Sequence, residues 1–268
     1  MNITWWGTGT VVLKSAEQSI VFDPFIQLPG GEHPTDMDVF KTTGNAFITH
    51  SKATHLSSVP ELIEKTDVVV HCGPEAAKTL IKMGISMKQI RSIHQGDIIP
   101  VEDIQVRALK GRYVGFGPFM VLKTVVNPRM IRYSKNLFRL AKLHRKFSDD
   151  DITLAYHIKA EGKNILLLGS LALDERTDYP KDIDVLILPY QGSSSLQKKA
   201  MAIVRKIRPR TVILSHFDDA FPPISKSINP KKFRVAMRKR LPDINLVIPQ
   251  VGNPINLEEI EKEKLDEV

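Results

Sequence analysis

Cysteine, long apolar runs and a secretory leader are scarce or missing in this sequence. Its 268 residues include one cysteine, Cys72, which excludes an internal disulfide and a cysteine-based zinc site. No apolar run approaches the roughly 20 residues that a membrane-spanning helix requires. The N-terminus lacks a basic region followed by an apolar stretch and a small-residue cleavage site, so we expect a cytoplasmic protein.

Acidic residues are absent from one stretch of the chain. Residues 107–147 contain eleven lysines and arginines and no aspartate or glutamate, although the net charge of the whole chain is only +8. Apolar residues in the second half of this stretch recur at helical spacing and predict a basic amphipathic helix; they are Met130, Tyr133, Leu137, Leu140 and Ala141. Three alternatives stay open: a core-packed helix with a solvated charged side, a self-association surface, or a surface for anions.

The rest of the sequence predicts a single α/β domain. Hydrophobic residues make up 42% and charged residues 25%, which is typical of a globular protein, and no low-complexity linker interrupts the chain. We expect strands near residues 3–6, 11–14, 19–22, 45–49, 68–71, 98–101, 104–109, 120–126, 153–160, 164–168, 185–189, 211–214 and 246–248, and helices near 60–65, 74–83, 195–206 and 231–240. The domain would span residues 1–256, with the basic insert at about 111–150 and an acidic tail at 257–268.

Three histidines follow predicted strands. His50 and His55 come after the strand at 45–49, and His216 comes after the strand at 211–214. Neutral imidazoles at the ends of neighbouring strands are a common way to bring metal ligands to one point. These three residues are therefore the candidate metal ligands.

Several short motifs occur in a recognisable order along nearly the whole chain. They are Ile3-Thr-Trp-Trp-Gly-Thr-Gly, Ile20-Val-Phe-Asp-Pro-Phe25, Ile48-Thr-His50 through His55-Leu56, Ile165-Leu-Leu-Leu-Gly169-Ser170, Asp184-Val-Leu-Ile-Leu188 and Val212-Ile-Leu-Ser-His216-Phe-Asp-Asp219. In this order they resemble the metallo-β-lactamase superfamily, and within it the small cytoplasmic metal-dependent hydrolases. The resemblance implies an α/β fold, the αββα four-layer sandwich, in which two sheets face each other, helices lie outside and the site lies at one edge.

The metal motif departs from the pattern of that superfamily. The family sequence His-x-His-x-Asp-His would place its four ligands at His50, Lys52, Thr54 and His55, so the second histidine and the acid are replaced. Ser170 stands where many members have a bridging aspartate. The resemblance leaves His50 for one metal position, and His55 with His216 for the other.

This ligand count predicts no metal or a single weakly held zinc ion, and no two-metal centre. A catalytic zinc ion normally has three protein ligands and a water molecule. The Lys52 ammonium, in place of a histidine, would repel a divalent cation and supply part of its positive charge.

Two functions remain from the sequence. The first is a non-catalytic or weakly active binding protein for a small anionic or amphipathic ligand. Its binding residues would be Arg132, Arg139 and Ser170. A membrane surface is a second possible partner. The alternative is a single-metal or metal-free hydrolase of phosphate or carboxylate esters, in which His55 or His216 is the base and Lys52 stabilises the oxyanion.

Other classes fit the sequence less well. Nucleic acid is not expected, because superfamily members that process it depend on an intact two-metal motif. Serine hydrolysis lacks support because Ser170 has no Gly-x-Ser-x-Gly setting. The sequence leaves the oligomeric state open.

Overall fold

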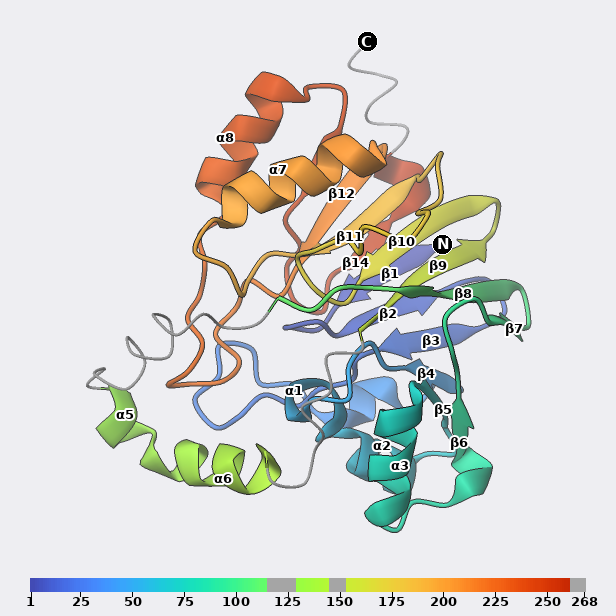
Figure 1. Cartoon of the computed structure of the whole chain (residues 1–268), viewed down its shortest axis with the longest axis vertical. Coiled ribbons are helices and arrows are strands. Elements are labelled where there is room, and N and C mark those ends of the chain that lie inside the picture. The colour runs from blue at the N-terminus through green and yellow to red at the C-terminus, as the bar shows by residue number, and fades with distance from the viewer. Residues whose placement is uncertain (115–128, 145–152, 261–268) are drawn as a thin grey trace.

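Two seven-stranded sheets form the centre of the computed structural model, which describes residues 1–114, 129–144 and 153–260 (Figure 1). The first sheet, in the order β14-β1-β2-β3-β4-β5-β6, contains β1 Asn2–Trp5, β2 Val11–Lys14, β3 Ser19–Phe22, β4 Asn45–Phe47, β5 Val69–Cys72, β6 Ile90–Ser92 and β14 Pro254–Asn256. The second sheet, in the order β13-β12-β11-β10-β9-β8-β7, contains β7 Ile98–Val101, β8 Ile104–Lys110, β9 Leu154–Ala160, β10 Lys163–Leu168, β11 Val185–Pro189, β12 Thr211–Ser215 and β13 Asn245–Val247.

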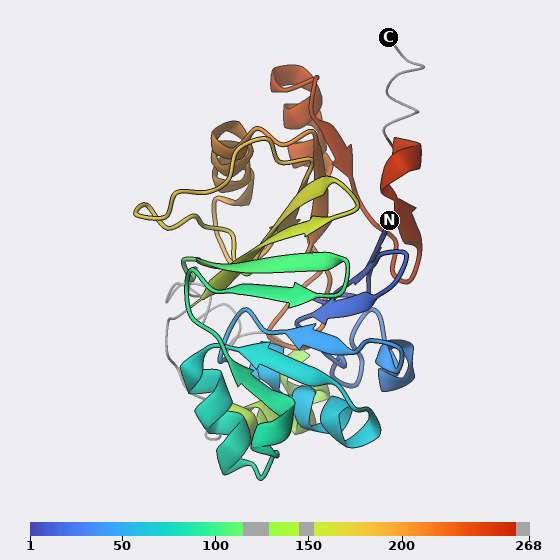
Figure 2. The same ribbon diagram turned by 90° about the vertical axis from the view of Figure 1, so that its right-hand side faces the viewer.

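Helices cover the outer face of each sheet. The first sheet packs against α2 Val59–Lys65 and α3 Pro74–Lys82, and the second against α7 Leu196–Ile207 and α8 Lys231–Arg240. Figure 2 shows α3 at one end of the molecule and α7 and α8 at the other, with both sheets between them. The remaining elements are the short helix α1 Ala53–Leu56, helices α5 Arg129–Arg132 and α6 Ser134–His144, and two 3-10 turns, Met37–Phe40 and Met87–Gln89. The predicted αββα sandwich is confirmed.

The hydrophobic patterns explain these layers. The strands from β3 to β6 and from β10 to β13 run parallel and need helical crossovers, so apolar residues face both an outer helix and the opposite sheet. Accordingly β11 is buried along its whole length, whereas the antiparallel β8 alternates buried and exposed residues through its first half. The core between the sheets includes Trp5, Phe22 and Tyr156.

The two sheets are joined by hydrogen bonds at one edge. The Leu154 backbone N–H donates to the Thr49 carbonyl oxygen at 2.8 Å, and His50 pairs with Thr153 in an isolated antiparallel bridge. The buried Tyr156 hydroxyl also donates to the Ile48 carbonyl oxygen at 2.6 Å. We call this junction between Ile48–His50 and Thr153–Tyr156 the seam.

The structure corrects the prediction of one basic helix, and two other predictions fall wholly or partly outside the residues that it describes. The basic amphipathic helix is two helices, α5 and α6, because the chain turns at Tyr133, whose ring packs against Gly30. The predicted strand at 120–126 lies outside the described residues.

The C-terminal tail is described only in part. Residues 257–260 are helical, and Leu257 is buried in the core. Residues 261–268 of the predicted tail lie outside the described residues, so the predicted domain limits stay a prediction. Within the described ranges, no helix is long and apolar enough to cross a membrane.

His71 in β5 makes stability depend on pH. Its ring stacks on Phe47 at a centroid distance of 4.5 Å, and burial together with Arg91 lowers the pKa of His71 to about 4. An unfolded chain protonates this histidine below about pH 6.5, whereas the folded chain resists protonation until about pH 4. The contribution of His71 therefore destabilises the fold progressively as the pH falls between these two values.

We expect His71→Phe, which keeps an aromatic ring on Phe47, to remove this contribution. We compare the free energy of unfolding of the variant with that of the wild type. The difference should be about 2 kcal/mol more favourable to the variant at about pH 5 than at pH 7. Urea unfolding of both proteins at the two pH values tests this. Parallel pH dependences would show that His71 is protonated equally easily in the folded and unfolded chains.

Candidate metal-binding site

Four side chains from both sheets meet at the edge where the seam lies. Asp23 follows β3 directly, His50 lies in the seam just after β4, His55 lies on α1, and His216 follows β12 directly. Both Asp23 (φ +44°) and His216 (φ +60°) have left-handed backbone conformations, which turn the chain sharply at the strand ends. The C-terminal ends of β3 and β4 in the first sheet and of β12 in the second sheet thus meet at one place.

Asp23 is the buried anchor of this cluster. Its carboxylate accepts hydrogen bonds from the Thr49 backbone N–H at 2.8 Å and from the Thr49 hydroxyl at 2.5 Å. It also lies 3.0 Å from His55 Nδ1. Because an ionised carboxylate only accepts hydrogen bonds, His55 carries its proton on Nδ1, and Nε2 has a lone pair.

Thr49 fixes His50 in the same way. The Thr49 hydroxyl gives its one proton to Asp23, so at 2.7 Å it accepts a hydrogen bond from His50 Nδ1. His50 is buried, and its Nε2 has no hydrogen-bond partner among the described residues. A buried lone pair without a partner is costly unless a ligand uses it.

Gln191 is the hydrogen-bond partner of Nδ1 in the third histidine, His216. The Gln191 side-chain amide donates to the Asp218 and Lys226 carbonyl oxygens at 3.2 and 3.4 Å, which directs its oxygen toward His216 Nδ1 at 3.1 Å. His216 therefore also has its proton on Nδ1. Its backbone N–H donates to the Thr8 carbonyl oxygen at 2.7 Å, which ties this loop to the turn after β1.

The buried Asp218 supports the same turn. Its carboxylate accepts a hydrogen bond from the Thr8 backbone N–H at 2.9 Å and one from the Gln27 amide at 2.6 Å. Burial raises the pKa of Asp218 despite these hydrogen bonds. The carboxylate thus ties the loop after His216 to the turn at Thr8 and to Gln27.

The three imidazoles lie close together. The rings of His50 and His55 stack at a centroid distance of 4.4 Å, and those of His55 and His216 lie 5.9 Å apart. Burial and the neighbouring His55 lower the pKa of His216 to about 3, and burial holds the pKa of His50 well below its usual value. Neutral imidazole is the form that binds metal ions.

Lys52 and Ser170 lie at the border of this cluster. The Lys52 ammonium lies 4.0 Å from the centroid of the Tyr113 ring, and the edge of Tyr113 meets His50 at a centroid distance of 5.5 Å. The Ser170 hydroxyl accepts a hydrogen bond from the Val114 backbone N–H at 3.1 Å, so it holds the segment after β8 that carries Tyr113. Lys52 thus belongs to the surroundings of the histidines through Tyr113.

The other two predicted ligand-binding residues lie elsewhere. Arg132 on α5 and Arg139 on α6 are exposed, and the Arg132 guanidinium lies 5.6 Å from the Tyr133 ring. The structure therefore brings His50, His55, His216, Lys52 and Ser170 to one edge and leaves the two arginines on the outer helices.

Sequence reasoning missed Asp23, Thr49 and Gln191, which orient the histidines. From the sequence, Asp23 is included only within the motif Ile20-Val-Phe-Asp-Pro-Phe25 and is assigned no role. Its position directly after a buried strand, in step with His50 after the next strand, was the available signal. Gln191 had no signal of its own, because its contact depends on how β11 and β12 are paired.

Comparison with known proteins agrees with this geometry. The sequence pattern of the beta-lactamase superfamily domain matches residues 2–216. The chain belongs to this superfamily. A UPF0173 protein of Pyrococcus abyssi is 23% identical over 221 residues, covering 81% of this chain and 83% of the relative. The resemblance to the metallo-β-lactamase superfamily is thus confirmed.

Solved structures show the same fold. Igni18, a metallo hydrolase of Ignicoccus hospitalis, superposes with a TM-score of 0.64 at 16% identity, over 95% of this chain and 97% of that protein. The isothiocyanate hydrolase from Delia radicum gut bacteria has a TM-score of 0.61 at 12% identity, over 96% and 98%. At these identities the comparison establishes the architecture of the chain.

The residues at this edge fit a metal ion. Ligand atoms of Asp23, His50 and His55 lie within 4.8 Å of one another. The Asp23 carboxylate also accepts hydrogen bonds from Thr49 and lies against His55 Nδ1, the arrangement in which carboxylates orient metal-bound histidines. The buried His50 Nε2 has no hydrogen-bond partner among the described residues, which makes it available to an ion at this place. His216 is not part of this group of three, but its ring lies beside that of His55.

Proposed function

We propose that this chain is a hydrolase that binds one divalent metal ion through Nε2 of His50, His55 and His216. One observation carries the proposal: each ring is hydrogen-bonded at Nδ1, by Thr49, Asp23 and Gln191 respectively, which leaves every Nε2 with a lone pair. A site that had lost its chemistry would have no need to keep the orienting residues of all three rings.

The chain's own groups have separate tasks in this proposal. A bound divalent ion would polarise the substrate and lower the pKa of a bound water molecule to about 7. Asp23, Thr49 and Gln191 hold the rings in the binding tautomer. Lys52 supplies a fixed cation for the oxygen of a phosphate or carboxylate ester that becomes negative during attack.

Metal analysis and a substrate panel test this function. We expect protein purified without chelator, or reconstituted with zinc or manganese, to hold about one equivalent of metal. Its turnover of phosphodiester, phosphomonoester, carboxylate ester or lactone substrates should disappear with chelator and return with metal. The matched control is His94→Ala. His94 is an exposed histidine just after β6, and the variant should bind metal normally.

Two results would reject this proposal. Two equivalents of metal per chain would indicate the ordinary two-metal centre of the superfamily. Metal binding without turnover of any substrate would instead favour the non-catalytic binding protein.

The role of Lys52 is tested separately. We expect Lys52→Met to lower turnover by about tenfold while metal affinity stays equal or rises, because the ammonium repels the ion but stabilises the oxyanion. The effect is smaller than the loss of a fully enclosed oxyanion donor, since part of the Lys52 interaction is directed to Tyr113. Steady-state kinetics and metal titration of the same preparation separate the two effects. Weaker metal binding in this variant would show that Lys52 supports the ligands.

A further inference from the structure

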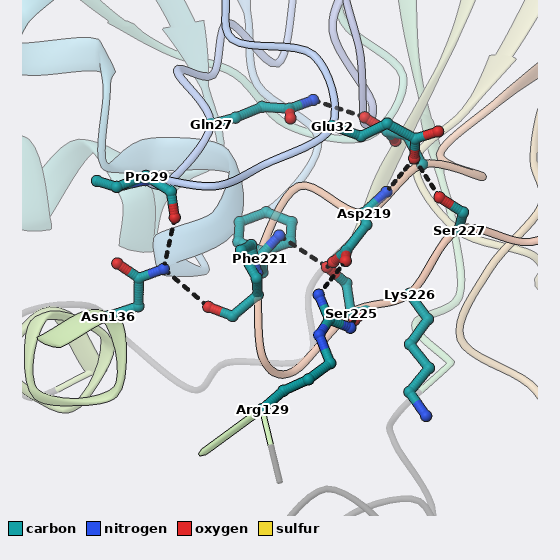
Figure 3. Close-up of polar contacts among 12 residues, drawn as sticks. Gln27, Pro29, Glu32, Arg129, Asn136, Asp219, Phe221, Ser225, Lys226 and Ser227 are labelled. Carbon is teal, nitrogen blue, oxygen red and sulfur yellow. Dashed lines mark hydrogen bonds and ion pairs between the residues drawn. The ribbon is translucent and has the colours of Figure 1, made fainter. Parts of the chain in front are cut away.

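Helices α5 and α6 are attached to the body of the protein by a buried polar network (Figure 3). The Asn136 side-chain amide donates to the carbonyl oxygens of Pro29 and Pro222, both at 2.9 Å, and Asn136 is only 4% exposed. Arg129 pairs with Asp219 and donates to the Ser225 carbonyl oxygen at 3.2 Å. These contacts fix the position of both helices.

The same contacts place the helices beside the histidines. Asp219 is three residues beyond His216, and the loop around Pro29 is also bonded to residues 219 and 220. In addition, α6 packs against α1, the helix that carries His55. The two helices therefore lie next to the edge that carries the histidines.

Apolar side chains lie on both faces of this element. Met130, Tyr133 and Leu137 are half-buried on the inner side, as the helical spacing predicts. On the outer side, Ile131 is 85% exposed and Phe138 78% exposed. They are the most exposed large apolar residues of the part of the chain that the structure describes, and the protein's own packing gives no reason for this exposure.

Basic side chains surround these two residues. Arg132, Lys135 and Arg139 are all exposed on the same two helices. No acidic residue occurs anywhere between positions 107 and 147. Exposed apolar residues mixed with cations are typical of helices that lie in a lipid interface.

Helix α8 provides an internal comparison. Six of its ten residues are lysine or arginine, but its aromatic residue Phe233 is fully buried against the second sheet. This helix is the ordinary solvated basic surface. Its exposed apolar residue, Val235, is smaller and only 58% exposed. Positive charge alone therefore does not distinguish α5 and α6; the larger and more exposed Ile131 and Phe138 do.

We propose that α5 and α6 bind an anionic lipid surface. Ile131 and Phe138 enter the boundary between headgroups and acyl chains, while Arg132, Lys135 and Arg139 contact lipid phosphates. A second copy of the same face would bring like charges together, and a nucleic acid backbone would leave the two apolar side chains in water. Binding in this orientation turns the histidine edge toward the membrane, and it does not depend on metal in the site.

Vesicle sedimentation tests the proposal with the full chain. We expect the wild type to bind vesicles that contain phosphatidylglycerol and not vesicles of phosphatidylcholine alone. Arg132→Gln with Arg139→Gln should weaken binding by about thirtyfold, because each cation near an anionic surface contributes roughly fivefold. Ile131→Ser with Phe138→Ser should weaken binding by about tenfold or more at equal net charge. Both variants replace exposed residues, so their melting temperatures should match the wild type.

A variant in α8 is the matched control. Lys232→Gln with Val235→Ser and Lys239→Gln removes two exposed cations and one exposed apolar side chain, and it should change vesicle binding by less than about twofold. An equal loss in this control would mean that vesicles respond to total charge, and would overturn the proposal. The proposal would also fail if the wild type did not bind anionic vesicles, if a nucleic acid competed through the same residues, or if Phe138→Ser converted a dimer to a monomer.

Discussion

Replacing Asp23 by asparagine is expected to weaken zinc binding by about a hundredfold, because residues that orient metal-bound histidines typically contribute 10- to 100-fold. The single oxygen of the new amide must still accept the Thr49 backbone N–H. The NH2 group therefore takes the place of the oxygen beside His55. That group donates to His55 Nδ1 and moves the ring proton to Nε2. The variant keeps its shape and loses the metal-binding lone pair of His55. The Thr49 hydroxyl also loses the oxygen that accepts its proton, so the orientation of His50 is weakened as well.

Competition titration with a zinc indicator measures this effect, and circular dichroism checks the fold. Asp184→Asn is the matched control, since Asp184 also accepts a backbone hydrogen bond, from Asn164 at 2.8 Å, but at the start of β11. Its zinc affinity should equal that of the wild type. Unchanged affinity in Asp23→Asn would mean that His55 does not bind the ion through Nε2.

A methyl group at Gly169 is expected to destabilise the whole protein by about 3 kcal/mol, the upper part of the range for overpacked cores. A Cβ atom there would lie 2.6 Å from Thr49 Cβ and 2.8 Å from the Leu154 carbonyl oxygen. Neither neighbour can move, because both belong to the seam and Thr49 also holds Asp23 and His50. Gly169→Ala should therefore unfold at a lower urea concentration and lose metal affinity at the same time.

Gly73→Ala is the control for this substitution. A Cβ atom at Gly73 would meet nothing within 4 Å, so the free energy of unfolding should change by less than about 1 kcal/mol. If Gly169→Ala were as stable as this control, the two sheets would be able to separate slightly at the seam without cost.

The sequence predicted the scaffold well because its signals are local. Runs of β-branched and aliphatic residues mark β5, β10, β11 and β12, and Pro74 and Gly84 bracket α3. The order of the motifs then supplied the sandwich. None of these signals depends on contacts between distant residues.

The orienting residues of the site could not be predicted, because each acts across the fold. Asp23 reaches Thr49 and His55 only after β3 and β4 pair in parallel, and Gln191 reaches His216 only after β11 and β12 do. A count of ligands in the sequence registers the replaced positions Lys52 and Thr54. It does not register the hydrogen bonds that set the tautomers.

The basic segment shows a different limit of helical periodicity. The spacing correctly indicates an inner stripe, but it cannot show that the polar Asn136 is the deepest buried of the residues 129–139, nor that Phe138 is exposed. Asn136 is buried because two loop carbonyl groups, of Pro29 and Pro222, need a donor at that place.

The seam also determines which parts of the site can move. Its hydrogen bonds close the sandwich beneath the histidines, so the sheets cannot part there without exposing the core that contains Tyr156. His55, in contrast, lies on the four-residue helix α1, which can fray independently. Amide exchange should therefore be slow enough at Leu154 to report global unfolding and faster at His55, so that one ligand of the proposed site could open locally while the seam stays closed.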